Sequence, residues 1–173
     1  MPTLTAGTYP PYFSKYINLV HTENVEEAIK KYSGEILAFF QRIPVEKADY
    51  RYAEGKWSLK EMLQHIIDAE RIFAYRALSI ARLDKTPLPG FDENNYALAS
   101  NADQRSWESL LQEFVAVRKS TDLLLQNFTP DQLQHSGVTN NHTNTTIAIS
   151  FVIFGHILHH INVIKDRYLQ QEA

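Results

Sequence analysis

The stretch that decides the fold is residues 147–164, IAISFVIFGHILHHINVI, the most apolar part of the chain, which also contains three of the seven histidines. Its length of roughly 18 residues is near the lower limit for a membrane span. Ser150, Asn162 and the three histidines, however, are polar groups that lipid would leave unsatisfied. The stretch therefore predicts a buried helix in a globular protein, running from about Thr145 to Gln170.

The clearest helix start in the chain is WSLKEM, residues 57–62. Ser58 is a favourable N-cap, and Glu61 three residues later completes a capping box. Trp57 and Met62 have the spacing of a hydrophobic staple. These signals predict a second helix that runs to about Leu83.

Two further long helices are indicated by apolar residues at helical spacing. The sequence NVEEA, residues 24–28, offers an N-cap for a first helix that is expected to end near Arg42. Asp103 is expected to cap a third helix that ends near Asn127. TPDQL, residues 129–133, predicts one short additional turn of helix.

Four long helices without strand-like alternation predict an all-α protein, with residues 24–173 forming a single antiparallel four-helix bundle domain. Residues 1–23 contain prolines and glycines among tyrosines and are expected to form an extended N-terminal arm packed on the body. Residues 84–100 and 135–146 are expected to be loops. The first is longer than two antiparallel helices need, so it is a candidate wall of a site. Periodicity does not fix which helices touch, and other all-helical packings stay open.

Composition excludes several classes of function. The net charge is −3 and no run of Lys or Arg occurs, so we expect no nucleic-acid partner. The 173 residues include no cysteine, which excludes disulfides, thiolate zinc sites and a catalytic thiol. The N-terminal sequence has no charged region followed by an apolar block, so we expect a cytoplasmic protein without a membrane partner. Walker, G-x-S-x-G and G-x-G-x-x-G motifs are also missing.

His156 and His160 are one helical turn apart and share a face with apolar residues. Both imidazoles should therefore point into the bundle, where unpaired polar groups are costly. A divalent ion such as zinc, nickel, iron or copper would satisfy both rings. Ile157 occupies the position of the glutamate in the zinc-peptidase pattern H-E-x-x-H, so the base of that mechanism is missing.

A catalytic site of the zinc type takes three protein ligands and keeps one position open. His65, at the edge of the apolar face of the second helix, is the best candidate for the third ligand. Its alternative is a hydrogen-bonded core histidine, and the pair on the last helix could also be structural. His159 lies on a polar stripe that is expected to face outward. The remaining histidines, expected to be exposed, are His21, His135 and His142.

Charged residues near the ligands are candidates for supporting roles, with Asp68 and Arg76 as candidate catalytic residues. Asp68 and Glu70 could orient the ligands or act as a base, or they could be ordinary surface charge. Arg76 and Arg167 lie on the same lines as the ligands and could meet an anionic substrate. Salt bridges with neighbouring glutamates are the alternative for both arginines.

Three blocks of sequence resemble the DinB-like superfamily, which includes the DinB and YfiT proteins. The blocks are GKWSLKEMLQHIIDAERIFAYRAL (55–78), LPGFDENNYA (88–97) and GHILHHINVIKDRYL (155–169). The likeness extends from about Tyr52 to Tyr168. It implies a four-helix bundle with a three-histidine site for nickel or zinc. The positions that match the ligands of that family are His65, His156 and His160.

The resemblance also implies a function. Members of this bacterial superfamily are often called metal-dependent hydrolases, and relatives include S-transferases that use bacillithiol, mycothiol or glutathione and a mycothiol-dependent maleylpyruvate isomerase. We therefore expect a metal-dependent S-transferase that joins a low-molecular-weight thiol to a small-molecule substrate. A metal-dependent hydrolase and a non-catalytic metal-binding or ligand-binding module are the alternatives. Because two helical faces need cover beyond one bundle, we expect a homodimer.

Overall fold

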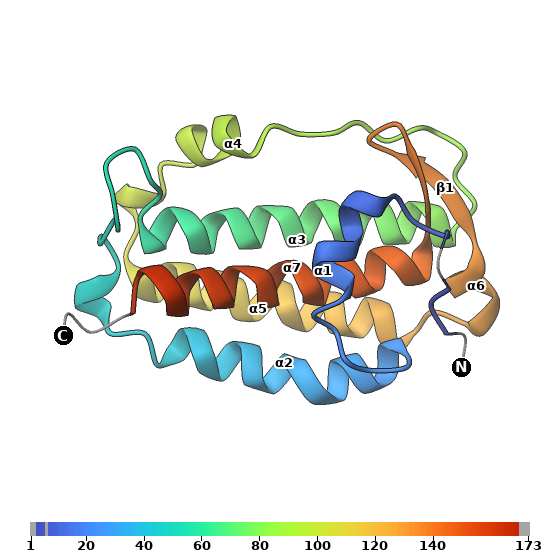
Figure 1. The fold of residues 1–173 in the computed structure, drawn as a ribbon, viewed down its shortest axis with the longest axis horizontal. Coiled ribbons are helices and arrows are strands. Elements are labelled where there is room, and N and C mark those ends of the chain that lie inside the picture. Colours follow the sequence, from blue (N-terminus) through green and yellow to red (C-terminus); the bar gives the residue numbers. More distant parts are fainter. Residues whose placement is uncertain (1–2, 6, 170–173) are drawn as a thin grey trace.

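A computed structural model describes residues 3–5 and 7–169 and contains four long helices that lie side by side (Figure 1). They are α2 (Val25–Gln41), α3 (Leu59–Ala81), α5 (Trp107–Gln126) and α7 (Thr146–Arg167). Helix α3 packs against α7 and α5, and α2 packs against the same two helices. The predicted fold class, an all-α four-helix bundle, is confirmed.

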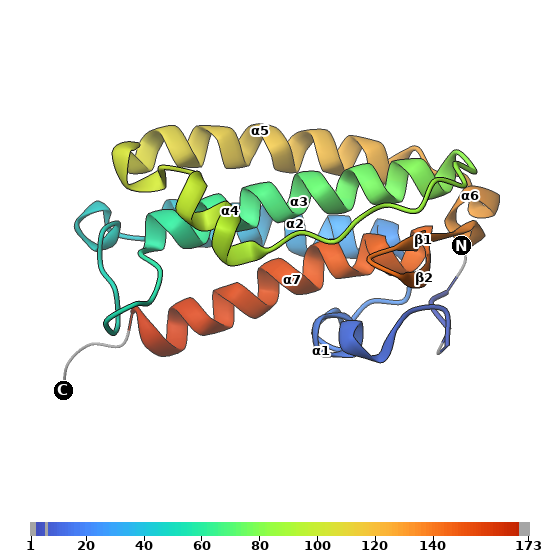
Figure 2. The ribbon, with the colours of Figure 1, turned by 90° about the horizontal axis from the view of Figure 1, so that it is seen from above.

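The direction of each helix explains the length of the connection between α3 and α5. The neighbouring pairs α3–α7 and α2–α5 are antiparallel, whereas α3 and α5 run in the same direction (Figure 1). Consecutive helices that run in the same direction can be joined only by a long segment that returns along the bundle. Residues 82–106 do this, running along α3 before α5 begins (Figure 2).

The predicted start of α3 is confirmed by its hydrogen bonds. The Ser58 hydroxyl accepts from the Glu61 amide at 3.2 Å, and the Glu61 carboxylate accepts from the Ser58 amide at 2.7 Å. This reciprocal pair satisfies two amides that the first helical turn leaves free. The helix ends at Ala81, slightly before the predicted Leu83, whose φ of 61° is incompatible with a continuing helix.

The predicted cap of α5 was wrong. Asp103 lies in a short 3-10 helix (Ala102–Gln104), and its carboxylate accepts from the Ser58 hydroxyl at 3.0 Å and from Arg51 at 2.8 Å. Ser106 is the cap, because its hydroxyl accepts from the Ser109 amide at 3.1 Å. Both residue types cap well, and the tertiary contacts of Asp103 decided between them.

Neither predicted loop is fully irregular. Residues 84–100 contain α4 (Glu93–Ala99), which the Asp92 side chain caps by accepting from the Asn95 amide. Residues 135–146 form a hairpin of β1 (Ser136–Thr139) and β2 (His142–Thr145), preceded by α6 (Pro130–Gln134). Its strands are short and mostly polar, so they lack the alternation that indicates a strand.

The hairpin turn is made by Asn140 and Asn141, whose φ angles are 50° and 62°. Asparagine tolerates this left-handed region, which a two-residue hairpin turn requires. Leu88 then pairs with the hairpin: its amide donates to the Val138 carbonyl at 3.0 Å, and its carbonyl accepts from the Asn140 amide at 2.9 Å. The hairpin thereby fixes one end of the long connection.

The N-terminal arm is not simply extended, as the sequence had suggested. It forms a 3-10 turn (Pro11–Phe13) and a short helix α1 (Ser14–Ile17), which packs on α7 on the side away from α5 (Figure 2). A Cβ at Gly155 would lie 2.2 Å from the Tyr16 carbonyl oxygen, so only glycine permits this approach. The proposed boundary between residues 23 and 24 stays a prediction, and Gln170 lies outside the described residues.

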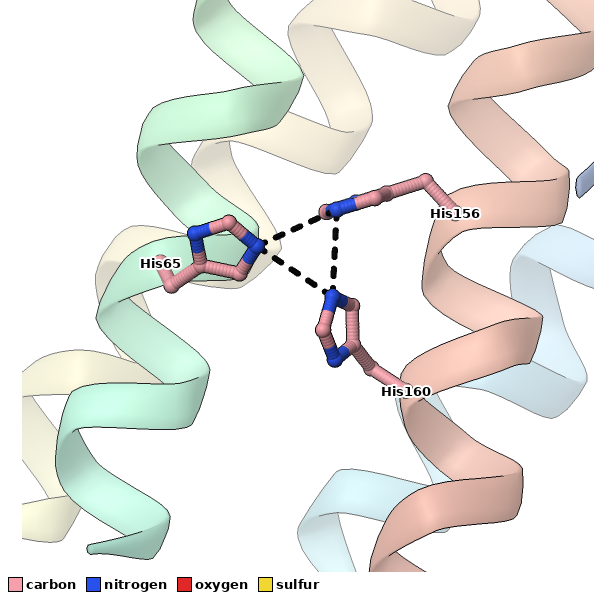
Figure 3. A group of neighbouring side chains, drawn as sticks. All are labelled: His65, His156 and His160. Atoms are coloured by element: carbon pink, nitrogen blue, oxygen red, sulfur yellow. Dashed lines mark hydrogen bonds between the residues drawn. The ribbon is translucent and has the colours of Figure 1, made fainter. Parts of the chain in front are cut away.

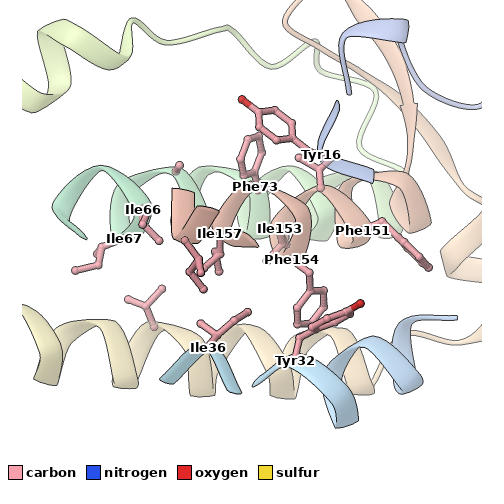
Figure 4. Close-up of a cluster of buried hydrophobic side chains, with 14 of the residues drawn as sticks. Tyr16, Tyr32, Ile36, Ile66, Ile67, Phe73, Phe151, Ile153, Phe154 and Ile157 are labelled. Atoms are coloured by element: carbon pink, nitrogen blue, oxygen red, sulfur yellow. The ribbon is translucent and has the colours of Figure 1, made fainter. Parts of the chain in front are cut away.

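Helix α7 is long and apolar enough to cross a membrane by length and composition, but 78% of its most apolar window is buried inside the protein. Ile157 and Phe154 of α7 point toward Ile36 and Tyr32 of α2 (Figure 4). Burial among the other helices accounts for its apolar sequence, as for the central helix of a globular core.

A buried ion pair joins α5 to α3. The Arg118 guanidinium donates from Nη1 to Glu70 Oε1 at 2.8 Å, and the two side chains are 0% and 1% exposed. Burial raises the pKa of Glu70, and the charge of Arg118 opposes that rise. Glu70, a candidate for orienting the metal ligands, is therefore engaged in the core instead.

Candidate metal centre

Three imidazoles from two helices converge at one point in the bundle (Figure 3). The Nε2 atom of His65, on α3, lies 3.1 Å from Nε2 of His156 and 3.2 Å from Nε2 of His160. The two Nε2 atoms of α7 are 3.1 Å apart. His65 and His156 are buried and His160 is partly buried. The spacing of one turn places both α7 rings on the face that packs against α3.

Aromatic neighbours hold these rings in place. The Trp57 ring lies 4.8 Å from the His65 ring, centroid to centroid. Phe73 and Tyr16 contact the His156 ring edge-on at 5.6 Å and 5.4 Å. Packing of this kind restricts rotation of the imidazoles and so fixes the direction of their Nε2 atoms.

The charge state of the three rings suits metal binding. Burial lowers the pKa of His65 to about 4. The pKa values of His156 and His160 are held well below the ordinary histidine value, first by burial and then by the neighbouring imidazoles. All three rings are therefore neutral near pH 7, with a lone pair available on each.

Hydrogen bonding alone cannot satisfy this arrangement. In a neutral imidazole each nitrogen is either a donor or an acceptor. At least two of the three Nε2 atoms must therefore be of the same type, and two donors or two acceptors cannot form a hydrogen bond with each other. The Nδ1 atoms of His65 and His160 are buried and also have no hydrogen-bond partner. A cation satisfies all three Nε2 atoms at once. Nitrogens this far apart share points about 2.0–2.1 Å from all three, the usual zinc–imidazole distance.

A cavity of about 350 Å³ opens beside the histidine cluster and is lined by His65 and His156. Its walls come from the arm, α3, the connection before α4, the start of α4, the hairpin and α7. The residues that contribute are Pro10, Tyr12, Phe13, Tyr16, His65, Phe73, Arg76, Gly90, Phe91, Glu93, Thr139, Asn140, His142, Asn144 and His156. Residues 84–100, expected to be a site wall, thus line the cavity through three of their members.

Comparison with known proteins identifies the family. The model of the DinB superfamily matches residues 30–164, most of the chain. The chain belongs to the DinB superfamily. A candidate metal-dependent hydrolase of Oceanobacillus iheyensis is 23% identical over 151 residues, which cover 84% of this chain and 86% of that protein.

Solved structures of similar fold agree with this membership. YfiT from Bacillus subtilis, described as a probable metal-dependent hydrolase with an unusual four-helix bundle topology, aligns with a TM-score of 0.69 at 16% identity, over 94% of this chain and 90% of YfiT. A mycothiol-dependent maleylpyruvate isomerase aligns with a TM-score of 0.65 at 10% identity, over 87% of this chain and 59% of that one. At these identities the likeness shows the fold alone.

Asp68 lies apart from the cavity. Its carboxylate accepts from Gln64 Nε2 at 2.9 Å, and Gln64 Oε1 accepts from Arg105 at 2.7 Å. Arg105 in turn contacts Glu113 of α5. Burial raises the pKa of Asp68, while Gln64 and the nearby arginines oppose that rise. These contacts belong to a polar network between α3 and α5, and they give no support to a catalytic role, which stays a prediction.

Arg76 does line the cavity. Its Nη2 donates to the Pro89 carbonyl at 2.7 Å, and its guanidinium carbon lies 5.7 Å from the centre of the Phe73 ring. Burial lowers its pKa from the ordinary arginine value. Arg167, by contrast, is exposed at the end of α7 and does not contribute to the cavity.

The other histidines differ partly from expectation. His159 is half-buried and packs edge-on against Tyr16, with ring centroids 5.5 Å apart, rather than facing solvent freely. His135 is half-buried too, and contacts the Ala81 carbonyl and Asp131. His21 and His142 are exposed as expected, and His142 borders the cavity.

The sequence did not indicate the contribution of the hairpin to the cavity. Thr139 and Asn144 are buried and line it, although both lie in a stretch that reads as a polar loop. The one available signal was Asn140–Asn141, a dipeptide suited to a tight hairpin turn. Recognising that turn would have placed Thr139 and Asn144 on paired strands.

Proposed function

We propose that this DinB-superfamily protein is an enzyme that uses a divalent metal ion, nickel or zinc, held by His65, His156 and His160. The observation that carries the proposal is the triangle of Nε2 atoms 3.1–3.2 Å apart beside a cavity of about 350 Å³. Cavities of this size accommodate small-molecule substrates. The descriptions of the relatives from Oceanobacillus iheyensis and Bacillus subtilis as metal-dependent hydrolases support it.

The reaction we propose is transfer of a low-molecular-weight thiol to a small electrophilic substrate. A divalent ion at this position supplies Lewis acidity, which lowers the pKa of a thiol or water that it binds. The chain has no cysteine, so the thiol is a cosubstrate. Similarity in fold to a mycothiol-dependent isomerase supports a thiol-linked reaction.

The side chains of the protein orient the ligands and shape the site. Trp57 and Phe73 hold the rings of His65 and His156, which keeps their nitrogens converging. Phe13 and Phe91 form apolar walls of the cavity, which exclude water from a bound substrate. Arg76 presents a positive charge on the same cavity. The protein thereby offers both an apolar and a cationic surface to a ligand.

Hydrolysis is the second candidate reaction, and the descriptions of the relatives favour it. It needs the same three ligands and an activated water instead of a thiol. The two reactions differ in one requirement, a thiol cosubstrate, and can be separated by a single set of assays.

The test uses protein purified without a histidine tag and loaded with nickel or zinc. Monochlorobimane is incubated with bacillithiol, mycothiol or glutathione in separate reactions, and p-nitrophenyl acetate is supplied without thiol. Conjugation that depends on one thiol and is lost in His65→Ala supports the transferase, and thiol-independent ester cleavage supports the hydrolase. An exposed control, His21→Ala, should keep full activity. The absence of both reactions at every metal loading would contradict an enzymatic role and favour a binding module.

We further propose that the protein is cytoplasmic and homodimeric and acts on a small molecule rather than on nucleic acid. The absence of cysteine fits a reducing compartment. The net charge of −3 does not favour a polyanion partner. Light scattering coupled to size-exclusion chromatography will separate a dimer from a monomer, and a mass near 19.9 kDa would contradict the dimer.

A further inference from the structure

The cavity has a second polar region, formed around Arg76, that the metal proposal does not use. The Arg76 side chain is 5% exposed, yet among the described residues no carboxylate lies within salt-bridge distance of it. Its one hydrogen bond is to the Pro89 carbonyl. A guanidinium has five N–H donors, so most of them lack a protein acceptor. A buried charge without a counterion is costly unless a ligand supplies one.

A second unused donor lies on the hairpin. The Thr139 side chain is 1% exposed, and its hydroxyl oxygen accepts from Asn144 Nδ2 at 3.0 Å. Asn144 Nδ2 also donates to the His142 carbonyl at 3.0 Å, which fixes its amide. Because the Thr139 oxygen already acts as the acceptor, its own proton is free to donate to a ligand in the cavity.

The two donors belong to the same part of the cavity. Arg76 bonds to the Pro89 carbonyl, and the preceding residue, Leu88, pairs with Val138 and Asn140 on either side of Thr139. The short segment Leu88–Pro89 therefore connects Arg76 to the hairpin. Gly90 also lies close to the hairpin, because a Cβ at Gly90 would lie 2.3 Å from the side-chain oxygen of Asn140.

The distance from this region to the histidines is short enough for one small molecule to span. The Phe73 ring centre lies 5.6 Å from that of His156 and 5.7 Å from the Arg76 guanidinium carbon. The guanidinium carbon is therefore at most about 11 Å from the centre of the His156 ring. Phe73 thus contacts both ends of this region, and the aromatic rings of Phe73 and Phe91 both form part of the cavity wall.

We infer that Arg76 and Thr139 bind the carboxylate of a small substrate whose apolar part lies along Phe73 and Phe91. That the other end of this substrate reacts at the histidines rests on the proposed function. The recognition of the carboxylate does not. Glu93, the carboxylate among the lining residues, is exposed. Its negative charge, which also acts on Tyr16 of the arm, disfavours binding of an anion on the side of the cavity near the arm.

The test measures binding of three probes that share a phenyl group: 3-phenylpropanoate, its neutral amide and phenyl phosphate. Titration calorimetry or ligand-observed NMR is carried out on zinc-loaded and on chelator-stripped protein. The carboxylate should bind the wild type at least 10-fold more tightly than the amide. Arg76→Met should weaken carboxylate binding about 10- to 100-fold, the range for a hydrogen bond to a charged group, and leave amide binding unchanged.

Three further variants serve as controls. Arg82→Met removes an exposed arginine at the end of the same helix and should change nothing. Arg76→Lys keeps the charge and should retain part of the preference for the carboxylate. Thr139→Val removes one hydroxyl and should weaken carboxylate binding about 3- to 10-fold. If Arg76→Met fails to fold, the comparison of probes on the wild type and on Arg76→Lys still decides the question.

Equal binding of carboxylate and amide to the wild type would overturn the inference. So would tighter binding of phenyl phosphate, because the ligand would then be a phosphate. Carboxylate binding that survives Arg76→Met but disappears when the metal is stripped would also overturn it, since the carboxylate would then be bound by the metal. A protein that binds no metal but keeps the carboxylate preference would refute only the metal proposal.

Discussion

Replacing Gly155 by alanine should loosen the arm from α7, and a second glycine in the chain provides a matched control. A Cβ at Gly155 would lie 2.2 Å from the Tyr16 carbonyl oxygen and 2.5 Å from the carbonyl carbon. Both are backbone atoms, which cannot rotate away, so α1 must retreat by about 1 Å to restore ordinary contact. Such a shift disturbs the packing of Phe13, Tyr16 and Ile17, all of which are buried.

The magnitude follows from comparing two substitutions. Gly34 lies in the interior of α2 with no atom within 4 Å of the added Cβ. Alanine should therefore stabilise the protein there by about 1 kcal/mol, the helix-propensity difference. Gly155→Ala gains the same stabilisation from helix propensity but also loses about 1–3 kcal/mol of stability because the added methyl group overpacks against α1. At about 2–4 °C per kcal/mol for a chain of this size, Gly34→Ala should melt about 2–12 °C above Gly155→Ala.

Two measurements check this prediction. Thermal unfolding followed by circular dichroism gives the order of the melting temperatures. Limited trypsin digestion followed by mass spectrometry gives the rate of cleavage after Lys15, which lies in α1. Cleavage should be faster in Gly155→Ala than in the wild type and unchanged in Gly34→Ala. Equal melting temperatures and equal cleavage rates for the two variants would refute the close packing of the arm on α7.

Two further predictions concern buried ionisable groups. The pKa of His65 is about 4 in the folded state, below the unfolded value of 6.5, so the unfolded state binds more protons between these pH values. The metal-free protein should therefore lose stability as the pH falls from about 6.5 to 4. His65 alone contributes about 3 kcal/mol to this loss of stability. The free energy of unfolding, measured with guanidinium chloride, should therefore depend less on pH in His65→Leu than in the wild type. An identical pH dependence in the two proteins would count against a buried neutral ring. Arg118→Met should reduce the free energy of unfolding by about 3–5 kcal/mol, because it leaves Glu70 buried without its partner and also removes the partner of the partly buried Asp122. The double variant Arg118→Met/Glu70→Met should recover most of that loss, and a double variant no more stable than the single one would contradict the ion-pair explanation.

The sequence predicted the long helices and two members of the histidine cluster because both depend on local spacing. The capping box at Ser58 and Glu61 operates within one turn, and the pair His156 and His160 shares a face by helix geometry alone. His65 could be added because a bundle brings α3 against α7. These features were accessible without knowledge of the tertiary structure.

The features that the sequence did not predict depend on contacts between distant segments. Aspartate and serine are both good N-caps, but the Asp103 carboxylate instead accepts hydrogen bonds from Ser58 and Arg51. Arg118 pairs with Asp122 one helical turn away, but its buried partner Glu70 is 48 positions away in sequence, so periodicity gives no sign of the pair between α3 and α5. Segments without a helical or strand period, such as the hairpin, read as loops even when they form a wall of the cavity.

We propose above that three imidazoles from α3 and α7 hold one divalent cation. Anomalous diffraction from crystals of tag-free protein, collected at the absorption edge of the bound metal, tests it most directly. We expect a single strong peak about 2.0–2.1 Å from the Nε2 atoms of His65, His156 and His160. An empty position there after incubation with nickel and zinc, or a peak elsewhere that persists in His65→Ala, would contradict it.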